Sequence, residues 1–543
     1  MTIIVGVGGF FHDFNAAAIK IADSLNAPLV VTAEEERFSR KKHHSIMGAK
    51  STSYDCIKHC LSKIEASFEQ VDYVILSDKE VHPLKSFLVS LFPNAEFHHV
   101  GHHLCHAAAA FYSSGYDDAA ILCLDGFGDN KSGLLAYGNK NEIQPIKYIE
   151  LENSIGLEYL RVTFQIGLGS FGSEGKTQGL AAYGTPKFFD DYMNEIELTD
   201  DGGFLLSEQL KNMESYLEGE HYIQEKSLFN DFILDRIERR FKENPLKQEH
   251  IDMAASIQQV LDTIGLHCSA TLKSATKTSK LVTTGGVALN STMNGKLLES
   301  NLFEGVYAHP SASDRGNALG AALYFITNTM HIHTPLKEPI IYGGQEFSNE
   351  EIENNLKDFG ISGEKLDDPC QVGAELIAGG KILGWFQGRS ELGARALGNR
   401  SILADPRSTE NKDILNLKVK HREYFRPFAP SVLSEKTKDY FVTNVDLPYM
   451  TMTVKVVDDK KGLIPAVTHQ DDTARVQSVS SANNPLYHSL ISKFNDITGV
   501  PVVINTSFND SGEPIVETPK DAIQCFLKTG MDALIMGNWL IKK

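Results

Sequence analysis

The sequence predicts an α/β protein with two domains, and three observations carry this prediction. The chain has 543 residues, which is more than a single hydrophobic core usually supports. Strands, glycine turns and helical stretches follow one another in the first part, whereas short β-rich runs separate arginine- and lysine-dense segments in the second. A stretch rich in proline, glycine and polar residues lies between them at 330–352. We therefore expect one domain at 1–343 and another at 344–543.

Composition and charge exclude several classes of partner. Hydrophobic residues make up 42% of the chain, which describes a globular protein with a large core. The net charge of −18 argues against nonspecific binding to nucleic acid or to an anionic membrane, because these partners need basic surfaces. No run approaches the about 20 apolar residues that span a bilayer, and no charged leader precedes the first apolar run, so we expect a cytoplasmic protein. Seven scattered cysteines do not form a disulfide framework.

The first part contains a repeated strand, turn and strand unit. The first copy is "IIVGVGG" followed by "AAAIKI", and the second is "AAILCLDGFGDNKSGLLAYG" at 119–138. Glycine turns of this kind let backbone amides approach phosphate, and two such halves are typical of nucleotide-binding folds of the actin and sugar-kinase type. Two ordinary hairpins would fit the same residues.

A helical pattern over 205–275 is followed by a second glycine turn. Apolar residues at helical spacing predict a buried stripe on one face of its last helix (Ile257, Val260, Leu261, Ile264 and Cys268). The next segment, "KLVTTGGVALNSTMNGKL", predicts a strand, a Gly-Gly turn and a helix. A nucleotide can lie against such a turn and the helix N-terminus, although the Gly-Gly pair alone is a weak indication.

The stretch "HHVGHHLCHAAAAF" predicts a helix with two metal-binding histidines. His102 and His106 stand four residues apart, so both imidazoles project from one face, whereas His103 would point elsewhere. Further ligands are Asp125, at the end of the strand "AILCLD", and Asp314 in "HPSASDRGNALGAA". Two imidazoles and two carboxylates suit iron(II), manganese or zinc better than calcium. The alternative is that the histidines only cap and solvate the helix start.

Two further clusters suggest anion binding. The glycine-rich stretch "FGSEGKTQGLAAYGTP" predicts a flexible loop in which Glu174 and Lys176 could contact a phosphate or a ribose, or else a mobile surface loop; it is not a Walker motif. The second part is dense in cations (Arg389, Arg395, Arg400, Arg407, Lys418, Lys420, Arg422 and Arg426). Guanidinium forks match phosphate oxygens, so this density predicts a polyanion pocket that Arg475 and the turn "NTSFN" could complete. A solvated network of salt bridges is the alternative.

Nine motifs follow one another along nearly the whole chain. They are "GFFHDFNAAA", "EEERFSRKKH", "HHLCHAAAAFYSSGYDDAAILCLDG", "GSEGKTQGLAAYG", "TTGGVALN", "SDRGNALGAA", "GRSELGARALGNRSILADPR", "FRPFAPS" and "NTSFN". In this order they resemble the NodU/CmcH O-carbamoyltransferases, which include nodulation-factor and antibiotic carbamoyltransferases. The resemblance implies an N-terminal actin-like ATPase domain (ASKHA, with duplicated ribonuclease H-like halves), similar to the universal tRNA threonylcarbamoyltransferase. It implies a C-terminal α+β domain similar to YrdC.

The resemblance also implies a reaction. The YrdC-like domain would join carbamoyl phosphate to ATP, giving carbamoyl adenylate, with Mg(II) accompanying ATP. The N-terminal domain would then pass the carbamoyl group to a hydroxyl of a small-molecule or glycan acceptor. A divalent metal, expected to be iron(II), would hold the adenylate and polarise developing negative charge. The arginine-dense half agrees with this scheme because carbamoyl phosphate and the triphosphate need a cationic pocket.

Site residues are carried over motif by motif. His12 in "GFFHD" is placed to act as general base on the acceptor hydroxyl, a task that suits imidazole near neutral pH, although it could equally cap a turn. The implied metal ligands are His102, His106, Asp125 and Asp314. The implied contacts of the adenylate are Gly285, Gly286 and Asn290. The implied pocket for carbamoyl phosphate and nucleotide contains Arg395, Lys420, Ser507 and, in the loosest of the motifs, Arg475.

Two other functions compete with O-carbamoyl transfer. A tRNA modification enzyme that acts through carbamoylated threonine is disfavoured by the acidic balance and by the fused YrdC-like half. A non-catalytic nucleotide-binding scaffold is disfavoured by the intact set of four metal ligands. We expect a small-molecule partner, no nucleic acid and no membrane, and a homodimer as the default oligomer. The sequence does not identify the acceptor, since acceptor pockets are built from variable loops.

Overall fold

The computed structural model describes residues 1–21, 28–46, 53–78, 82–140, 142–211, 231–332, 336 and 340–543. The chain divides into two units, the first made of 1–35 and 43–340 and the second of 36–42 and 341–543. The sequence analysis drew its boundary between 343 and 344 and assigned 36–42 to the first domain. This short segment contains most of helix α1 (Glu35–Ser39). Its Arg37 is buried and donates hydrogen bonds to the carbonyl oxygens of Glu391 (3.2 Å) and Gly393 (3.0 Å), which explains its grouping with the second unit.

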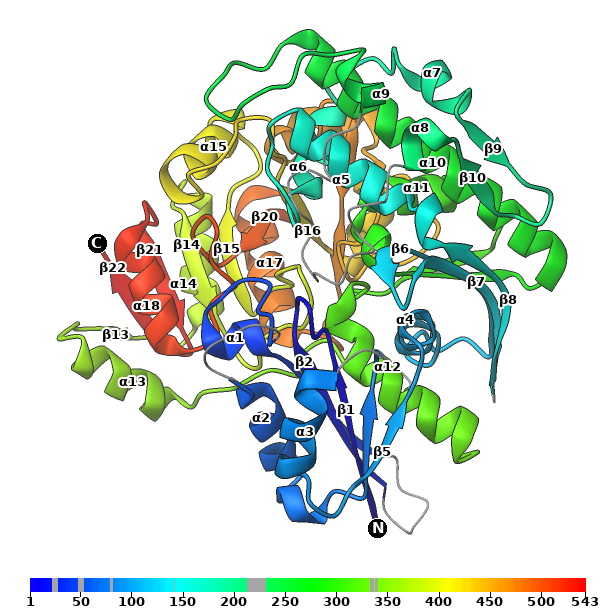
Figure 1. The fold of residues 1–543 in the computed structure, drawn as a ribbon. Coiled ribbons are helices and arrows are strands. Elements are labelled where there is room, and N and C mark those ends of the chain that lie inside the picture. The colour runs from blue at the N-terminus through cyan, green and yellow to red at the C-terminus, as the bar shows by residue number, and fades with distance from the viewer. Residues whose placement is uncertain are drawn as a thin grey trace. The chain divides into compact units, whose positions relative to one another are not determined.

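The first unit begins with a five-stranded mixed sheet (Figure 1). The strand order is β3-β2-β1-β4-β5. Strands β1 and β2, and β2 and β3, pair antiparallel, whereas β4 is parallel to β1 and β5 is parallel to β4. Their bounds are β1 (Thr2–Gly8), β2 (Asn15–Ile21), β3 (Leu29–Glu34), β4 (Tyr73–Leu76) and β5 (Glu96–His99).

A second five-stranded sheet repeats this topology. Its order is β8-β7-β6-β11-β12, with β6, β7 and β8 antiparallel and with β11 and β12 parallel to β6. The bounds are β6 (Asp118–Gly128), β7 (Lys131–Asn139), β8 (Glu142–Glu150), β11 (Lys280–Thr284) and β12 (Gly305–Ala308). The predicted duplication is therefore confirmed. The two hairpins are each part of a larger mixed sheet, as in actin-like folds, and are not independent elements.

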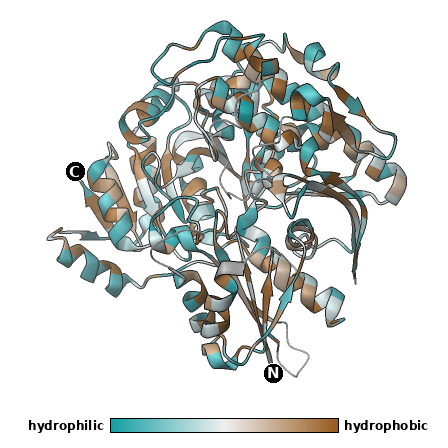
Figure 2. Ribbon diagram, viewed as in Figure 1, coloured by the Kyte–Doolittle hydropathy of each residue, from teal (hydrophilic) through white to brown (hydrophobic). Residues whose placement is uncertain are grey.

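Small residues let two helices pack closely in the core of this unit. Helices α4 (His102–Phe111) and α12 (Asn317–Tyr324) contact each other, and α12 also packs on β1. A side chain at Gly320 would place its Cβ 1.8 Å from the carbonyl oxygen of Cys105, and one at Gly6 would lie 1.9 Å from that of Ala318. Only glycine fits at these two crossings. Strand β1 is buried after its first residue and is hydrophobic in Figure 2.

The long helix α10 (Gln248–Thr276) carries the predicted apolar stripe. All five residues of that stripe are buried, so this part of the prediction is confirmed (Ile257, Val260, Leu261, Ile264 and Cys268). The part of the helical prediction at 212–230 lies outside the described residues. Helices α5 (Ile155–Gln165) and α6 (Glu174–Ala181) pack against α10, as does α11 (Ser291–Glu299).

The remaining described elements of the first unit are short. They are α2 (Asp55–Lys63), α3 (His82–Leu91), α7 (Phe189–Met193), β9 (Ile196–Leu198), β10 (Phe204–Leu206), α8 (Glu208–Lys211) and α9 (Asp231–Leu234). The seven cysteines of the chain are all buried and unpaired, which confirms that there is no disulfide framework. Within the described ranges, none of the helices combines the length and the hydrophobicity that crossing a bilayer requires.

The second unit is built on an eight-stranded mixed sheet. Its order is β13-β22-β21-β14-β15-β20-β16-β19. The strands are β13 (Glu364–Lys365), β14 (Leu383–Phe386), β15 (Arg400–Ala404), β16 (Ala429–Leu433), β19 (Gln477–Val479), β20 (Val502–Ser507), β21 (Ala533–Met536) and β22 (Trp539–Lys542). A separate pair is formed by β17 (Thr453–Lys455) and β18 (Thr473–Arg475). The helices are α13 (Asn349–Asp358), α14 (Pro369–Ala378), α15 (Thr409–Ile414), α16 (Thr437–Tyr440), α17 (Pro485–Thr498) and α18 (Pro519–Lys528).

Candidate functional site

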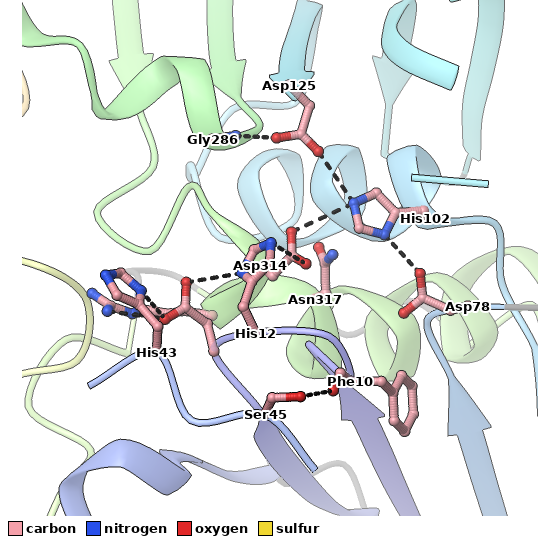
Figure 3. Close-up of polar contacts among 12 residues, drawn as sticks. Phe10, His12, His43, Ser45, Asp78, His102, Asp125, Gly286, Asp314 and Asn317 are labelled. Carbon is pink, nitrogen blue, oxygen red and sulfur yellow. Dashed lines mark hydrogen bonds and ion pairs between the residues drawn. The ribbon is translucent and has the colours of Figure 1, made fainter. Parts of the chain in front are cut away.

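Four side chains from three segments of the first unit converge. Figure 3 shows three of them, His102, Asp125 and Asp314. His102 and His106 lie on successive turns of α4, Asp125 belongs to β6, and Asp314 begins a short 3-10 turn (Asp314–Gly316) before α12. One donor atom of each residue lies within 4.8 Å of every other, and all four side chains are buried. The structure therefore brings together all four residues that the motifs implied as metal ligands.

The spacing of the four donor atoms fits a single cation. His102 Nε2 lies 3.1 Å from His106 Nε2, 3.2 Å from Asp125 Oδ2 and 3.5 Å from Asp314 Oδ1. His106 Nε2 lies 3.4 Å from the same two carboxylate oxygens. Ligands about 2.1 Å from a metal ion are separated by about 3.0 Å when octahedral neighbours and by about 3.4 Å in a tetrahedron. The donor set of two nitrogens and two oxygens also suits a borderline transition metal.

Backbone contacts hold these side chains in place. The Asp129 side chain accepts a hydrogen bond from the His102 backbone N–H (2.9 Å) at the start of α4. The other oxygen of Asp125 accepts from the Gly286 N–H (2.8 Å). The adjacent Gly285 has a φ of 83°, and a Cβ there would lie 2.2 Å from the carbonyl oxygen of Leu124. The predicted Gly-Gly turn thus needs glycine in order to reach β6, and it orients a candidate metal ligand.

The four groups balance one another electrostatically. Burial lowers the pKa of His102. The charges of Asp314 and Asp78 outweigh burial, so the pKa of His102 lies well above its usual value. Burial raises the pKa of Asp125, but His102 and His106 hold it well below its usual range. The carboxylates thus favour the protonated form of the neighbouring imidazoles, and the imidazoles favour the ionised form of the carboxylates. A divalent cation would supply positive charge to the same carboxylates.

His12 lies at the edge of the same cluster, in the loop between β1 and β2. Its Nε2 is 3.6 Å from Asp314 Oδ2, and its Nδ1 is 3.3 Å from Asp13 Oδ2. Ser45 Oγ donates to the carbonyl oxygen of Phe10 (3.1 Å) and ties down this loop (Figure 3). Burial lowers the pKa of His12, but the two carboxylates raise it to about 9. The imidazole can accept a proton at neutral pH only when Asp314 is engaged by another positive charge.

Sequence analysis missed two carboxylates that contact these histidines. Asp13 is 2.8 Å from His43 Nδ1 and accepts from Arg315 Nε (3.2 Å) and Nη2 (3.1 Å). Asp78 Oδ1 is 2.9 Å from His102 Nδ1. The sequence does contain a signal for Asp78. The stretch "ILSD" places this acid after an aliphatic strand, just as "LCLD" places Asp125.

The expectation that His103 points elsewhere needs correction. Its Nε2 lies 4.0 Å from Asp125 Oδ2, the ring is buried, and Nε2 has no hydrogen-bond partner among the described residues. The reason is that almost the whole surface of α4 is buried, so no face of the helix is left for a solvated histidine. Burial, aided by His102, lowers the pKa of His103 to about 3, so this imidazole is neutral.

The glycine-rich stretch around Glu174 is not the flexible loop that we expected. Helix α6 begins at Glu174, directly after the turn at Gly172, whose φ is 81°. Lys176 Nζ donates to the carbonyl oxygen of Leu168 (2.9 Å). Glu174 is partly buried, which raises its pKa, and the charges of His43 and His12 act on it. The structure thus places Glu174 near the His12 loop, whereas Lys176 holds the preceding turn.

Asn290 caps helix α11 and belongs to a buried polar network. Its side-chain oxygen accepts from the Met293 N–H (3.0 Å), and its Nδ2 donates to Gln258 Oε1 (2.8 Å). Gln258 Nε2 also donates to Asp262 (2.8 Å). Burial raises the pKa of Asp262 to about 7, although the bond from Gln258 lowers it. A nucleotide at the Gly-Gly turn would meet this network beside the helix N-terminus.

Asp262 predicts a pH dependence of stability. Between its ordinary pKa of 3.8 and about 7, the folded protein keeps a proton that the unfolded chain releases. The free energy of unfolding contributed by Asp262 therefore falls as pH rises through this window. We expect Asp262→Asn to remove this loss, so its Tm should exceed that of the wild type by roughly 5 °C at pH 8 and by much less at pH 4. Thermal unfolding followed by circular dichroism measures both.

Asp252, on the same helix, is a control whose contribution to stability should have the opposite pH dependence. Its pKa is lowered, because the contacts with Lys187 (2.6 Å) and the Thr185 N–H (2.9 Å) outweigh burial. Asp252→Asn should lose stability at pH 8 and little at pH 3. An Asp262→Asn Tm difference that does not change with pH would contradict the raised pKa.

In the second unit, three arginines lie close enough for their charges to act on a fourth, Arg475. Burial lowers the pKa of Arg475 on β18, and the charges of Arg395, Arg422 and Arg426 lower it further. Arg475 Nε is buried and has no hydrogen-bond partner in the described part of the chain. Mutual repulsion of guanidinium groups is unfavourable unless an anion offsets it. The charges of Arg395 and Arg475 thus act on each other, and Arg422 and Arg426, from the same cation-dense part of the sequence, act on Arg475 as well.

Lys420, which the motifs imply for the carbamoyl-phosphate and nucleotide pocket, is bonded to oxygens of a neighbouring turn. Its Nζ donates to the carbonyl oxygens of Ser507 (2.8 Å) and Asn509 (2.8 Å) and to Asn509 Oδ1 (2.5 Å). An ammonium group has three donors, and these oxygens use them. Ser507 Oγ in turn donates to Asn509 Oδ1 (2.7 Å). Lys420 therefore holds the turn that carries Ser507.

The fold and the two clusters define a protein with a duplicated mixed sheet and a candidate metal centre in one unit and a cluster of arginine charges in the other. Comparison with known families is specific: residues 90–323 match the description "Carbamoyltransferase N-terminus", and residues 374–543 match "Carbamoyltransferase C-terminus". The chain belongs to the carbamoyltransferase family, whose members transfer carbamoyl groups.

Two relatives match nearly the whole chain, and a third matches about half of it. It is 38% identical to "Nodulation protein NolNO" of Sinorhizobium fredii, over 98% of this chain and 79% of that protein. It is 35% identical to "Uncharacterized protein sll1178" of Synechocystis, over 100% of this chain and 97% of that protein. It is 34% identical to "3'-hydroxymethylcephem-O-carbamoyltransferase" of Amycolatopsis lactamdurans, over 48% of each.

Proposed function

We propose that this protein is an ATP-dependent O-carbamoyltransferase that acts on a hydroxyl of a small-molecule or glycan acceptor. The observation that carries the proposal is the buried set of His102, His106, Asp125 and Asp314, with donor atoms at the spacing of one cation, in a chain of the carbamoyltransferase family. The name of the cephem relative, which specifies transfer to oxygen, supports a hydroxyl acceptor. A protein that consumes ATP is expected to act in the cytoplasm.

The first step would use the second unit as a YrdC-like domain. Carbamoyl phosphate, ATP and water would give carbamoyl adenylate, pyrophosphate and phosphate. Arg395 and Arg475 would bind the phosphate groups, because guanidinium forms charge-assisted hydrogen bonds with phosphate oxygens. The anion would also offset the repulsion among the four arginines. Ser507, in the turn that Lys420 holds, would exchange its hydrogen bond to Asn509 Oδ1 for one to the ligand.

The second step would use the first unit. His102, His106, Asp125 and Asp314 would hold a divalent metal, expected to be iron(II), which when bound polarises the carbamoyl carbonyl. With Asp314 engaged in this way, His12 Nε2 would take the proton of the acceptor hydroxyl. Asp13 would keep the His12 ring in place through Nδ1. The acceptor oxygen would bond to the carbamoyl carbon as the bond between that carbon and the AMP phosphate oxygen breaks. AMP, bound near Gly286 and Asn290, would be the leaving group.

The test separates the two steps. Purified protein is given ATP, Mg(II) and carbamoyl phosphate, and pyrophosphate release is measured; extracts of its source are then added and searched by mass for carbamoylated products. We expect pyrophosphate only when both substrates are present. Treatment with 1,10-phenanthroline, with Mg(II) in excess, should stop product formation and AMP release but leave pyrophosphate release. Absence of pyrophosphate release that depends on carbamoyl phosphate would refute the proposal.

A further inference from the structure

Asp78 lies outside the four-residue cluster and contacts one of its histidines. It directly follows β4, and its Oδ1 is 2.9 Å from His102 Nδ1 (Figure 3). Both side chains are buried, with 6% and 3% of their surfaces exposed. Asp78 is itself held in position, since Ser77 Oγ donates to Oδ2 (2.8 Å) and the Asp78 carbonyl oxygen is 3.1 Å from His99 Nδ1. This carboxylate is therefore part of a built, water-excluded contact.

The contact determines how His102 faces the cluster. An ionised carboxylate can only accept hydrogen bonds, so the Nδ1 atom of His102 must carry the proton that points to Asp78. The other ring nitrogen, Nε2, faces Asp125 and His106. The ring thus lies between a carboxylate from the first sheet and one from the second. With Nδ1–H fixed, the Nε2 lone pair becomes available to a cation without a change of ring orientation.

We propose that Asp78 is a positioning residue for the divalent cation, and that it fixes the tautomer and the ring orientation of His102. Carboxylates that accept the second N–H of a metal-bound histidine also raise the basicity of the coordinating nitrogen, and their loss typically lowers metal affinity about 10- to 100-fold. The proposal rests on the metal site in the proposed function. It adds a residue that belongs to neither the ligand set nor any of the motifs quoted above.

A second role has to be separated from this one. A buried contact between a carboxylate and an imidazolium also stabilises the ion-free fold, and loss of that contact would lower Tm without a specific effect on the metal. The affinity for the metal and the state of the Nδ1 proton distinguish the two roles. Neither measurement requires an acceptor or catalytic turnover, so failure here differs from failure of the proposed carbamoyl transfer.

The experiment titrates ion-free protein with Co(II) and with Zn(II). We expect the Kd to rise about 10-fold in Asp78→Asn, which keeps the shape and loses the charge, and up to about 100-fold in Asp78→Ala. In the Co(II)-loaded wild type, the His102 Nδ1–H should give an exchangeable, paramagnetically shifted proton resonance. In Asp78→Ala this resonance should disappear through exchange with water, and the visible Co(II) spectrum should change.

Asp129→Asn is the matched control. The Asp129 carboxylate also contacts His102, but it accepts from the backbone N–H and not from the ring. The Asn amide oxygen can still accept from the His102 N–H, so this variant removes only a nearby charge, and both Tm and Kd should stay close to the wild type, with Kd within about twofold. An Asp78→Ala protein that folds, binds Co(II) with wild-type Kd and keeps the shifted resonance overturns the proposal. If Asp78→Ala does not fold, wild-type Kd in Asp78→Asn overturns it equally.

Discussion

Replacing His106 with alanine should abolish carbamoyl transfer and leave carbamoyl-adenylate formation largely intact. His106 Nε2 lies 3.4 Å from both Asp125 Oδ2 and Asp314 Oδ1, so the substitution removes a donor that faces two carboxylates at once. The remaining three donors would hold a cation weakly, and we expect transfer to fall by at least about 100-fold. Pyrophosphate release measures the first step, and mass detection of the carbamoylated product together with AMP release measures the second.

A second histidine from the same run of sequence serves as the control. His98 contacts Glu96 (3.0 Å) on β5 and stacks near Phe325, outside the cluster. His98→Gln should leave both steps at wild-type rates. Equal loss of both steps in His106→Ala, in a protein whose Tm shows that it is folded, would contradict the division of the reaction between two sites.

The four candidate ligands could be found from sequence because each sits in a local pattern with a physical meaning. The spacing of His102 and His106 places them on one face of a helix whatever the rest of the fold. Asp125 ends a buried strand, and Asp314 precedes a helix of small residues. The structure shows why the last pattern matters: α12 can approach α4 closely only because Gly320 has no side chain. The small residues of α12 thus allow the carboxylate that precedes it to lie near α4.

A local pattern could suggest Asp78 but could not show that it contacts His102, because that contact depends on strand order. Asp78 reaches His102 only because β4 pairs parallel to β1, so that its carboxyl end lies near the start of α4. No local pattern states which strand will be the neighbour of β1. Lys420 illustrates a different limit. Its residue type suggested a phosphate ligand, but burial against the carbonyl oxygens of the 507–509 turn uses its donors, and the course of that turn is a tertiary property.

Local patterns also predicted part of the fold, but not the contacts between distant segments. The two glycine turns identified the duplicated hairpins, and "KLVTT" identified β11. The grouping of 36–42 with the second unit depends on hydrogen bonds from Arg37 to carbonyl groups more than 350 positions away in the chain, which no sequence window contains. Helix α6 replaced an expected loop because a single left-handed glycine, Gly172, is enough to turn the chain, and the glycines that follow are tolerated inside a short helix.

Replacing Arg395 with alanine should suppress the first step of the reaction. Arg395 is one of three arginines whose charges act on Arg475, so the four groups together offer a strong local attraction to a phosphate group. A hydrogen bond to a charged group contributes about 1.5–3 kcal/mol, which corresponds to roughly 10- to 100-fold in pyrophosphate release when it is lost. Arg395→Lys should restore only part of the rate, because an ammonium group keeps the charge but not the fork that matches two phosphate oxygens.

Arg407→Ala shows whether this effect is local to the four arginines. Arg407 lies in the same arginine-dense run, but its guanidinium is already bound by Asp405, with Nε 3.0 Å from each carboxylate oxygen. Its loss should leave pyrophosphate release unchanged. If Arg395→Ala also releases pyrophosphate at the wild-type rate, its assigned role is refuted. If both variants lose the step equally, the cations act through the net charge of the unit and not through a pocket. A pocket would depend on Arg395, which lies near other cations, and not on Arg407, which Asp405 neutralises.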